Sequence, residues 1–248
     1  MTRSLAELID SMLAGDKKSL AQLISLAENE SSTLPEILEI LQPHCGKSCR
    51  IGVTGPPGAG KSTLIDKLVT RIRDRGQSVG VIAVDPTSPL SGGAVLGDRV
   101  RMRRHYLDEG VFIRSMATRG SHGGLAKAVA AAVSLLDAFG TEVIIVETVG
   151  VGQTELSIAQ IADILVLVLV PESGDDIQAL KAGILEIADI IVVNKADREG
   201  AQRLVDEFRA VLAYGHGKTE PSVIPAQAVN DIGIEELYQE VDKRCKSC

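Results

Sequence analysis

Aromatic side chains are scarce in this sequence. It contains no tryptophan, three tyrosines and three phenylalanines among 248 residues. Proteins that bind single-stranded nucleic acid stack its bases on aromatic side chains, and this chain has few to offer. The formal net charge of −7 also disfavours nucleic acid and anionic membrane surfaces, because both would repel the chain. Composition therefore argues against both classes of partner.

Long apolar runs are also missing. The longest, ILVLVLV at residues 164–170, is far too short to span a bilayer. The first residues, MTRSLAELID, lack the apolar core of a secretory signal. We therefore expect a cytoplasmic protein.

The four histidines are dispersed along the sequence, so it contains no metal-storage tract. Four cysteines form two close pairs in the sequence, Cys45 with Cys49 and Cys245 with Cys248. We interpret them as free thiols without a role, because a zinc site needs four closely arranged ligands and a reducing compartment disfavours disulfides. Metal binding or redox cycling by the C-terminal C-x-x-C is the alternative.

Two kinds of periodicity divide the chain near residue 48. Before it, SLAELIDSML, KKSLAQLISLAE and PEILEIL carry apolar residues at spacings of three and four, which predicts amphipathic helices. After it, β-branched runs alternate with helical segments, a pattern typical of a mostly parallel sheet covered on both faces. We predict an α/β fold with a helical N-terminal extension at residues 1–48 packed on a domain at residues 49–248. Its sheet of about seven strands would contain RIGVT, VGVIAV, VFIR, VIIVE, ILVLVLV, IIVVN and SVIPA.

The segment GPPGAGKST, residues 55–63, matches the phosphate-binding pattern G-x-x-x-x-G-K-[ST] between a predicted strand and a predicted helix. Its glycines let the backbone turn N–H groups toward phosphate oxygens. The lysine would bridge the β- and γ-phosphates, and the serine hydroxyl would hold Mg²⁺. This predicts a P-loop NTPase fold whose nucleotide-binding residues here are Gly55, Gly58, Ala59, Gly60, Lys61, Ser62 and Thr63.

The tetrapeptide NKAD, residues 194–197, ends a later strand and predicts which base is bound. The Asp197 carboxylate can accept hydrogen bonds from both N1–H and the exocyclic amino group of guanine, a pair that adenine lacks. Asn194 can reach the ring edge, and Lys195 can lie along the base plane. GTP and GDP are therefore the expected ligands, with a helix cap as the alternative role of Asp197.

Carboxylates that follow strands and loops are candidate ligands of Mg²⁺, which prefers hard oxygen atoms. Asp85, Asp98 and Glu147 are these candidates beside Ser62, with capping as the alternative for the two aspartates. Glu147 opens ETVGVGQTE, where the N–H of Gly150 can meet a γ-phosphate. Lys61, Glu147 and Gly150 are the predicted catalytic residues. No catalytic base is identified, so we expect slow turnover that a partner stimulates.

The loop PESGDDIQALKAG, residues 171–183, places acidic side chains among glycines directly after a buried strand. By itself it predicts a strand-to-helix connection in which Asp175 or Asp176 caps a helix beginning near Ile177.

Taken together, these stretches resemble the MeaB/ArgK-type P-loop GTPases, chaperones of adenosylcobalamin-dependent acyl-CoA mutases that include the methylmalonic aciduria type A proteins. The resemblance covers most of residues 50–240. The matching segments are GVTGPPGAGKSTLID, VIAVDPTSPLSGGAVLGDRVRM, RGSHGGLAKA, VIIVETVGVGQTE, VLVLVPESGDDIQALKAGILEIADIIVVNKAD and GIEEL.

The resemblance implies that GTP binding and hydrolysis gate adenosylcobalamin delivery to a methylmalonyl-CoA mutase type of enzyme and protect that enzyme. It places Asp85, Asp98 and Glu147 with Ser62 around Mg²⁺. It also makes residues 85–102, 147–155 and 171–183 three nucleotide-dependent switches, the third of which contacts the mutase. The implied partner-switch residues are Asp175, Asp176, Gln178 and Lys181.

Two features depart from the family pattern. Family members commonly continue into a C-terminal helical arm that forms a dimer, whereas this chain stops at Cys248. A monomer, a nucleotide-dependent homodimer and an assembly held by the mutase are therefore the alternatives. In addition, PAQAVNDIG stands where a Ser-Ala pair usually supports guanine, with Ala226 and Gln227 as looser matches.

A metal-insertion GTPase and a small-molecule kinase are the alternative functions. The first would need a metal-ligand cluster that the scattered histidines do not supply. The second would need an acceptor pocket and a lid that excludes water. Nucleotide-dependent zinc or nickel binding would support the first, and ATP-dependent phosphorylation of an added acceptor would support the second.

Overall fold

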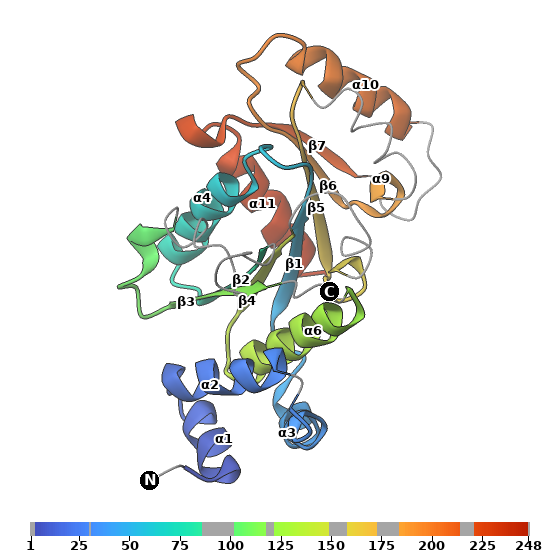
Figure 1. Cartoon of the computed structure of the whole chain (residues 1–248). Coiled ribbons are helices and arrows are strands. Elements are labelled where there is room, and N and C mark those ends of the chain that lie inside the picture. The colour runs from blue at the N-terminus through green and yellow to red at the C-terminus, as the bar shows by residue number, and fades with distance from the viewer. Residues whose placement is uncertain are drawn as a thin grey trace, which may run out of the picture.

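The computed structural model (Figure 1) describes residues 3–29, 31–85, 102–117, 122–148, 158–172, 184–213 and 221–247, with residues 85, 122–125 and 213 described by their backbone alone. The larger part of each predicted switch lies outside these ranges. So do six predicted site residues: Asp98, Gly150, Asp175, Asp176, Gln178 and Lys181.

Seven strands form a single parallel sheet in the order β3-β2-β4-β1-β5-β6-β7. The prediction of a mostly parallel sheet of about seven strands is confirmed. The central strands consist almost entirely of buried apolar residues, as expected for a sheet covered on both faces. The strands are β1 Cys49–Thr54, β2 Val79–Asp85, β3 Val111–Ala117, β4 Val143–Glu147, β5 Ile164–Leu169, β6 Ile190–Val193 and β7 Ser222–Pro225.

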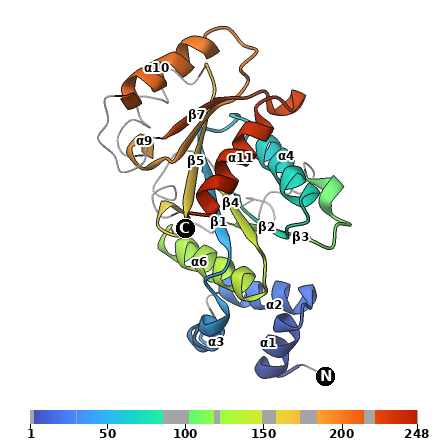
Figure 2. The ribbon, with the colours of Figure 1, turned by 180° about the vertical axis from the view of Figure 1, so that it is seen from behind.

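Helices cover both faces of the sheet, as Figures 1 and 2 show from opposite sides. Alternate residues of β4 point to opposite faces: Val143 and Ile145 pack with α4 and α11, and Ile144 and Val146 pack with α6. Helices α9 and α10 cover β5 and β6. None of the described helices is both long and apolar enough to cross a membrane. The helices are α4 Lys61–Asp74, α6 His122–Ala138, α9 Ile184–Ile187, α10 Ala201–Ala213 and α11 Ile234–Cys245, with the 3-10 turns η1 Gln42–His44, η2 Arg103–His105 and η3 Ala228–Asn230.

Three N-terminal helices, α1 Leu5–Leu13, α2 Lys17–Glu28 and α3 Leu34–Leu41, lie at one end of the molecule beside α6. Ser4 and Glu7 form a capping box at the start of α1, which satisfies N–H groups that the helix leaves free. The buried side chains of the three helices share one apolar cluster with α6 and with the sheet residues beneath it. These three helices, which we call the leader, thus pack against the sheet through α6.

Asp137, near the end of α6, fixes the segment that connects the leader to β1. Its carboxylate accepts hydrogen bonds from the backbone N–H groups of Gly46, Lys47 and Ser48 at 2.5, 3.0 and 3.1 Å. Burial acts to raise the pKa of Asp137, but these hydrogen bonds outweigh it, so the pKa lies below its usual value. The ionised form therefore stabilises the fold.

Replacing Asp137 with alanine is expected to lower the free energy of unfolding by about 2 to 3 kcal/mol, since three backbone N–H groups lose a charged acceptor. Asp137→Asn should cost less. Because the folded pKa is depressed, the contribution is present above the unfolded pKa, near 3.8, and is lost as the pH falls below it and through the lower folded pKa. Urea unfolding at several pH values measures this. A difference between wild type and Asp137→Asn that stays constant as the pH falls would contradict the assignment, and Asp10→Asn, at an exposed position of α1, is the control.

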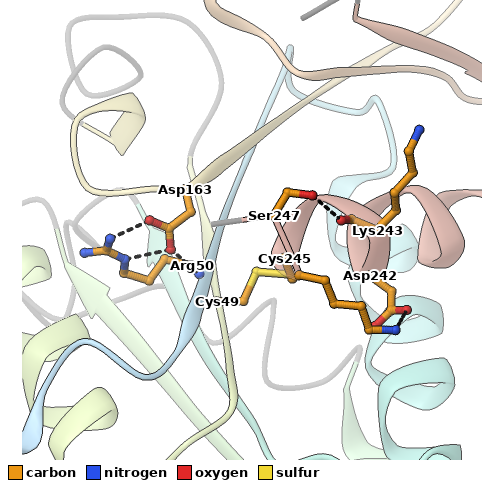
Figure 3. The surroundings of a disulfide bond; sticks show 8 residues. Cys49, Arg50, Asp163, Asp242, Lys243, Cys245 and Ser247 are labelled. Carbon is orange, nitrogen blue, oxygen red and sulfur yellow. Dashed lines mark hydrogen bonds and ion pairs between the residues drawn. A yellow bond between two sulfur atoms is a disulfide. The ribbon is translucent and has the colours of Figure 1, made fainter.

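The interpretation of all four cysteines as free thiols is wrong. Cys49, the first residue of β1, forms a disulfide with Cys245, the last residue of α11, as Figure 3 shows. Their Cα atoms lie 5.5 Å apart across 196 residues of sequence, a usual separation for a disulfide. Proximity in sequence did not reveal this pairing, because the fold brings the start of the central strand to the end of the last helix. Among the described cysteines Cys45 is free, and burial raises the pKa of its thiol.

Candidate nucleotide-binding site

The phosphate-binding loop connects the carboxyl end of β1, the middle strand of the sheet, to the N-terminus of α4. Gly55 and Gly60 have φ values of 140° and 91°, in the region that favours glycine. A Cβ at Gly55 would lie 2.0 Å from the carbonyl oxygen of Val168, and one at Gly60 would lie 2.4 Å from Asn194 Nδ2. The loop therefore needs glycine here both for its backbone conformation and for close packing against neighbouring strands.

Lys61 and Ser62, the first residues of α4, are buried beneath this loop. The Lys61 ammonium donates hydrogen bonds to the carbonyl oxygens of Gly55 and Pro56 at 2.8 and 3.1 Å. These contacts hold a positive charge at the N-terminus of a helix, where backbone N–H groups also favour anions. The arrangement is suited to binding phosphate.

Glu147 meets the P-loop because β4 lies beside β1. Its Cα pairs with Val53 in the sheet, and its Oε1 accepts a 2.8 Å hydrogen bond from the Ser62 hydroxyl. The next residue, Thr148, bonds to Thr54 at 2.9 Å and fixes the end of β4 against the end of β1. A hydroxyl and a carboxylate that touch in this way provide the hard oxygen atoms that Mg²⁺ prefers.

Asp85 is the last residue of β2 and stands two positions beyond Ala83, which pairs with Glu147. Its backbone therefore lies at the same carboxyl edge of the sheet as the predicted metal ligands Ser62 and Glu147. Within the described ranges, no three side chains of His, Cys, Asp or Glu gather closely enough to hold a metal ion. The fourth predicted ligand, Asp98, lies outside those ranges.

Asn194, at the start of NKAD, joins two loops of the site. Its amide Nδ2 donates to the carbonyl oxygen of Ala59 at 2.8 Å, and its Oδ1 accepts from the N–H of Ala228 at 3.1 Å. The side chain is 3% exposed. Both polar ends of Asn194 are thus engaged with protein backbone. Sequence reasoning assigned Asn194 a contact with the ring edge and missed this connecting role.

The loop between β7 and α11, residues 226–233, forms part of the cavity wall. We call it the β7–α11 loop. Ala226 is fully buried and exchanges backbone hydrogen bonds with Val193 and Ala196, so it lies beneath the cavity wall. Of the two predicted guanine-supporting residues, Gln227 lines the cavity and Ala226 is not among its lining residues. The sequence did not single out Ala228, Val229 and Asn230, which also line it.

One cavity of about 530 Å³ contains both motifs. This volume falls within the usual range for small-molecule sites. Asp197 and Lys195 face the same space as the P-loop, so a ligand with phosphates at one end and a base at the other can span it. The lining residues are Gly58, Gly60, Lys61, Ser62, Thr63 and Glu147 at the P-loop end, and Asn194, Lys195, Asp197, Arg198, Gln227, Ala228, Val229 and Asn230 at the other.

Arg198, directly after NKAD, forms an ion pair with Glu172 at the start of the PESGDDIQALKAG segment. The Arg198 guanidinium lowers the pKa of the Glu172 carboxyl through this hydrogen bond. Both side chains are about half exposed, so solvent screens the pair and its effect on stability is small. It places the beginning of the third predicted switch beside the cavity.

The fold and this site together define a P-loop protein of the GTPase class. The family model described as methylmalonyl-CoA mutase-associated GTPase MeaB matches residues 20–247, and the chain belongs to this family. The predicted resemblance is confirmed.

Individual relatives agree with this membership. A protein of Pyrococcus abyssi is 53% identical over 240 residues, which cover 95% of this chain and 74% of the relative. The GTPase ArgK of Escherichia coli is 36% identical over 248 residues, covering 96% and 75%. The mitochondrial methylmalonic aciduria type A homolog of Mus musculus is 34% identical over 256 residues, covering 95% and 62%.

Solved structures also match the fold. A structure described as LAO/AO transport system kinase superposes with a TM-score of 0.80 at 30% identity, covering 98% of this chain and 76% of that one. The hydrogenase maturation factor HypB of Archaeoglobus fulgidus superposes with a TM-score of 0.59 at 18% identity, covering 91% of this chain and 99% of that one. The second likeness shows a shared fold alone.

Proposed function

We propose that this chain binds and hydrolyses GTP, and that it uses this cycle to gate adenosylcobalamin delivery to a cobalamin-dependent acyl-CoA mutase of the methylmalonyl-CoA type and to protect that enzyme. The observation that carries the nucleotide part is the single cavity in which the P-loop and NKAD face each other. Membership of a family described as mutase-associated supports the partner.

In this proposal the P-loop holds the phosphates. Lys61 would exchange its contacts with the Gly55 and Pro56 carbonyl oxygens for contacts with β- and γ-phosphate oxygens. The N–H groups of Gly58 and Gly60, together with the start of α4, would complete the anion site. A charged lysine that is already buried loses little further hydration when phosphate binds, which favours the exchange.

Ser62 and Glu147, with Asp85 and Asp98, would hold Mg²⁺. The contact between the Ser62 hydroxyl and the Glu147 carboxylate fits such a group. Mg²⁺ bound there would neutralise charge on the β- and γ-phosphate oxygens. Without Mg²⁺, Glu147 would accept a hydrogen bond from Ser62, and with Mg²⁺ bound both side chains would be ligands of the ion. Because Glu147 is the first residue of the second predicted switch, this difference would alter the position of that switch, in which Gly150 would lie near the γ-phosphate.

The base end would select guanine through Asp197, with Lys195 along the ring and the β7–α11 loop on the other side. The partner side would use the third switch, with Asp175, Asp176, Gln178 and Lys181. Because no side chain is identified that positions the attacking water, we expect the isolated chain to turn over slowly and the mutase to complete the site.

Steady-state GTP hydrolysis tests the proposal, measured for the chain alone and with a mutase or its cobalamin-binding domain from the same source. We expect strong stimulation by the mutase. We also expect that alanine at both Gln178 and Lys181 abolishes this stimulation but leaves GTP affinity intact. Unchanged stimulation of that double variant would return residues 171–183 to the role of a helix cap. Absence of stimulation from an otherwise competent GTPase would overturn the assigned partner.

The same assay separates the rival functions. ATP in place of GTP, with phosphate appearing on an added acceptor, would favour a kinase, the activity in the description of the similar solved structure. Nucleotide-dependent binding of nickel or zinc would favour a metal-insertion GTPase. The described part of the chain provides no cluster of metal ligands for the latter.

A further inference from the structure

Three basic side chains follow one face of α4, the helix that begins with the P-loop lysine. Lys67, Arg71 and Arg75 are spaced four residues apart, so they lie in a row along the helix. All three contact acidic side chains of the segment from Asp231 to Glu235. The row therefore joins the phosphate-binding helix to the other half of the site.

The contacts at Asp231 connect α4 to the β7–α11 loop, whereas the contacts at Glu235 connect α4 to helix α11. Arg71 donates a 2.5 Å hydrogen bond to Asp231 Oδ2, and Lys67 Nζ lies 3.8 Å from Oδ1. Asp231 is the last residue of the β7–α11 loop before the antiparallel bridge between Gln227 and Ile232 closes it. Glu235 instead belongs to the first turn of α11 and contacts Arg71 and Arg75.

The backbone at Asp231 shows that the loop turns sharply at this point. Its φ is 62°, one of two positive values among described residues other than glycine. Aspartate and asparagine tolerate this conformation better than most residues. The residue at which the backbone turns is thus the same residue whose side chain connects the loop to α4.

Two anchors then hold the loop from opposite sides. On the sheet side, Asn194 accepts from Ala228 and Ala226 donates to Val193. On the helix side, Asp231 binds Arg71 and Lys67. The cavity-lining residues Gln227, Val229 and Asn230 lie between these anchors, and the Asn230 amide donates to Gln227 Oε1 at 3.0 Å. Without the second anchor, the far half of the loop would keep its own bridge and the packing of η3 against α4, but no ion pair to that helix.

We propose that Asp231 and Arg71 form a positioning pair that sets how tightly the cavity retains the base of its nucleotide. The proposal rests on the proposed GTP-binding function and deepens it. The pair fixes the base-facing loop relative to α4, which carries the phosphate-binding Lys61 and Ser62 at its N-terminus. Loosening it would let the loop swing away from the base while leaving the phosphate contacts in place.

The test is the dissociation rate of fluorescently labelled GDP, chased with excess GDP, for the full chain and its variants. Asp231→Asn keeps the tolerance for positive φ and removes the charge, and Arg71→Gln removes the other partner. Each is expected to speed release about fivefold, the effect of losing one half-buried ion pair. The double variant should speed release by clearly less than the product of the two single effects, because both changes break the same Asp231–Arg71 contact.

Arg75→Gln is the matched control. Arg75 lies one turn further along α4, binds Glu235 at 2.8 Å and covers the Tyr238 ring at 3.9 Å. It therefore joins α4 to α11 without touching the β7–α11 loop. Its release rate should change by less than about twofold. An equal effect of Arg75→Gln and Arg71→Gln would overturn the proposal, because helix docking alone would then explain both.

Steady-state kinetics separate positioning from general loss of structure. Asp231→Asn is expected to raise KM for GTP by about the same factor as the release rate, with kcat nearly unchanged, since KM follows dissociation when chemistry is slow. Partial unfolding would lower kcat and leave KM alone, and that result would overturn the proposal. If the wild-type chain binds no GDP, the proposed function itself fails. If the wild-type chain binds GDP and both variants release it at the wild-type rate, the positioning role of Asp231 and Arg71 is refuted and the proposed function stands.

Discussion

Replacing Asp197 with asparagine is expected to reverse the base preference of the cavity from guanine to xanthine. The aspartate can accept from N1–H and the exocyclic amino group of guanine, whereas asparagine presents an amide N–H₂ to that amino group. Xanthine carries an oxygen at this position and can accept from the amide. Because a site built around buried polar pairing rejects the mismatched ligand strongly, we expect affinity for GDP to fall by about 10³-fold or more.

Competition between labelled GDP and unlabelled GDP or xanthosine diphosphate measures this change directly. Glu199→Gln is the control, since Glu199 lies two residues further along the exposed turn and does not line the cavity. It should bind GDP as wild type does. If Asp197→Asn retained GDP affinity, Asp197 would be a turn-forming residue, and base selection would have to come from the β7–α11 loop.

The sheet and the P-loop could be predicted because their determinants are local. Each strand is a short apolar run bounded by turn residues, and parallel strands buried on both faces need no alternation. The P-loop pattern dictates its own backbone, since Gly55 and Gly60 adopt values that other residues disfavour. Family-specific segments then fixed the class, and membership of the MeaB family agrees with them.

The connections between distant segments could not be predicted in the same way. The roles of Asn194 and Asp231 depend on which backbone groups the fold brings near them. A signal for the second existed in the sequence: Lys67, Arg71 and Arg75 recur every fourth residue and imply an acidic partner for that face of α4. Which acidic segment would meet them depends on the packing of α11 against α4.

The prediction of free thiols failed for a related reason. Cys45 lies close in sequence to Cys49 and Cys245 lies close to Cys248, and the redox argument favoured no bond at all. The redox state of the cellular compartment determines only how readily disulfides form, whereas the fold determines which sulfur atoms come close enough to bond. The hydrogen bonds from Cys45 to the carbonyl oxygens of Leu41 and Ser134, each 3.4 Å long, hold its thiol against the leader and α6, away from the pair.

The disulfide between Cys49 and Cys245 is expected to contribute more to the free energy of unfolding than any single ion pair or hydrogen bond of α11. A bond that closes 196 residues removes much of the freedom of the unfolded chain, and the chain-entropy relation gives a stabilisation of about 5 kcal/mol for this length. Cys49→Ser should therefore lower the free energy of unfolding by about 5 kcal/mol and the Tm by about 15 °C. Thermal unfolding followed by circular dichroism measures the shift.

Reducing agent provides the internal control, because it should lower the Tm of the wild type to that of Cys49→Ser and leave the variant unchanged. Cys45→Ser, which alters a free thiol, should still respond to reduction as the wild type does. Other contacts keep α11 in place after reduction: Arg244 binds Glu240 at 2.8 Å and lies 3.7 Å from Asp189. The reduced protein should accordingly remain folded at 25 °C and keep its nucleotide site, because the bond lies at the end of α11 remote from the β7–α11 loop. Equal Tm values for the oxidised and reduced wild type would contradict the prediction, because they would mean that breaking the disulfide does not increase the conformational entropy of the unfolded chain.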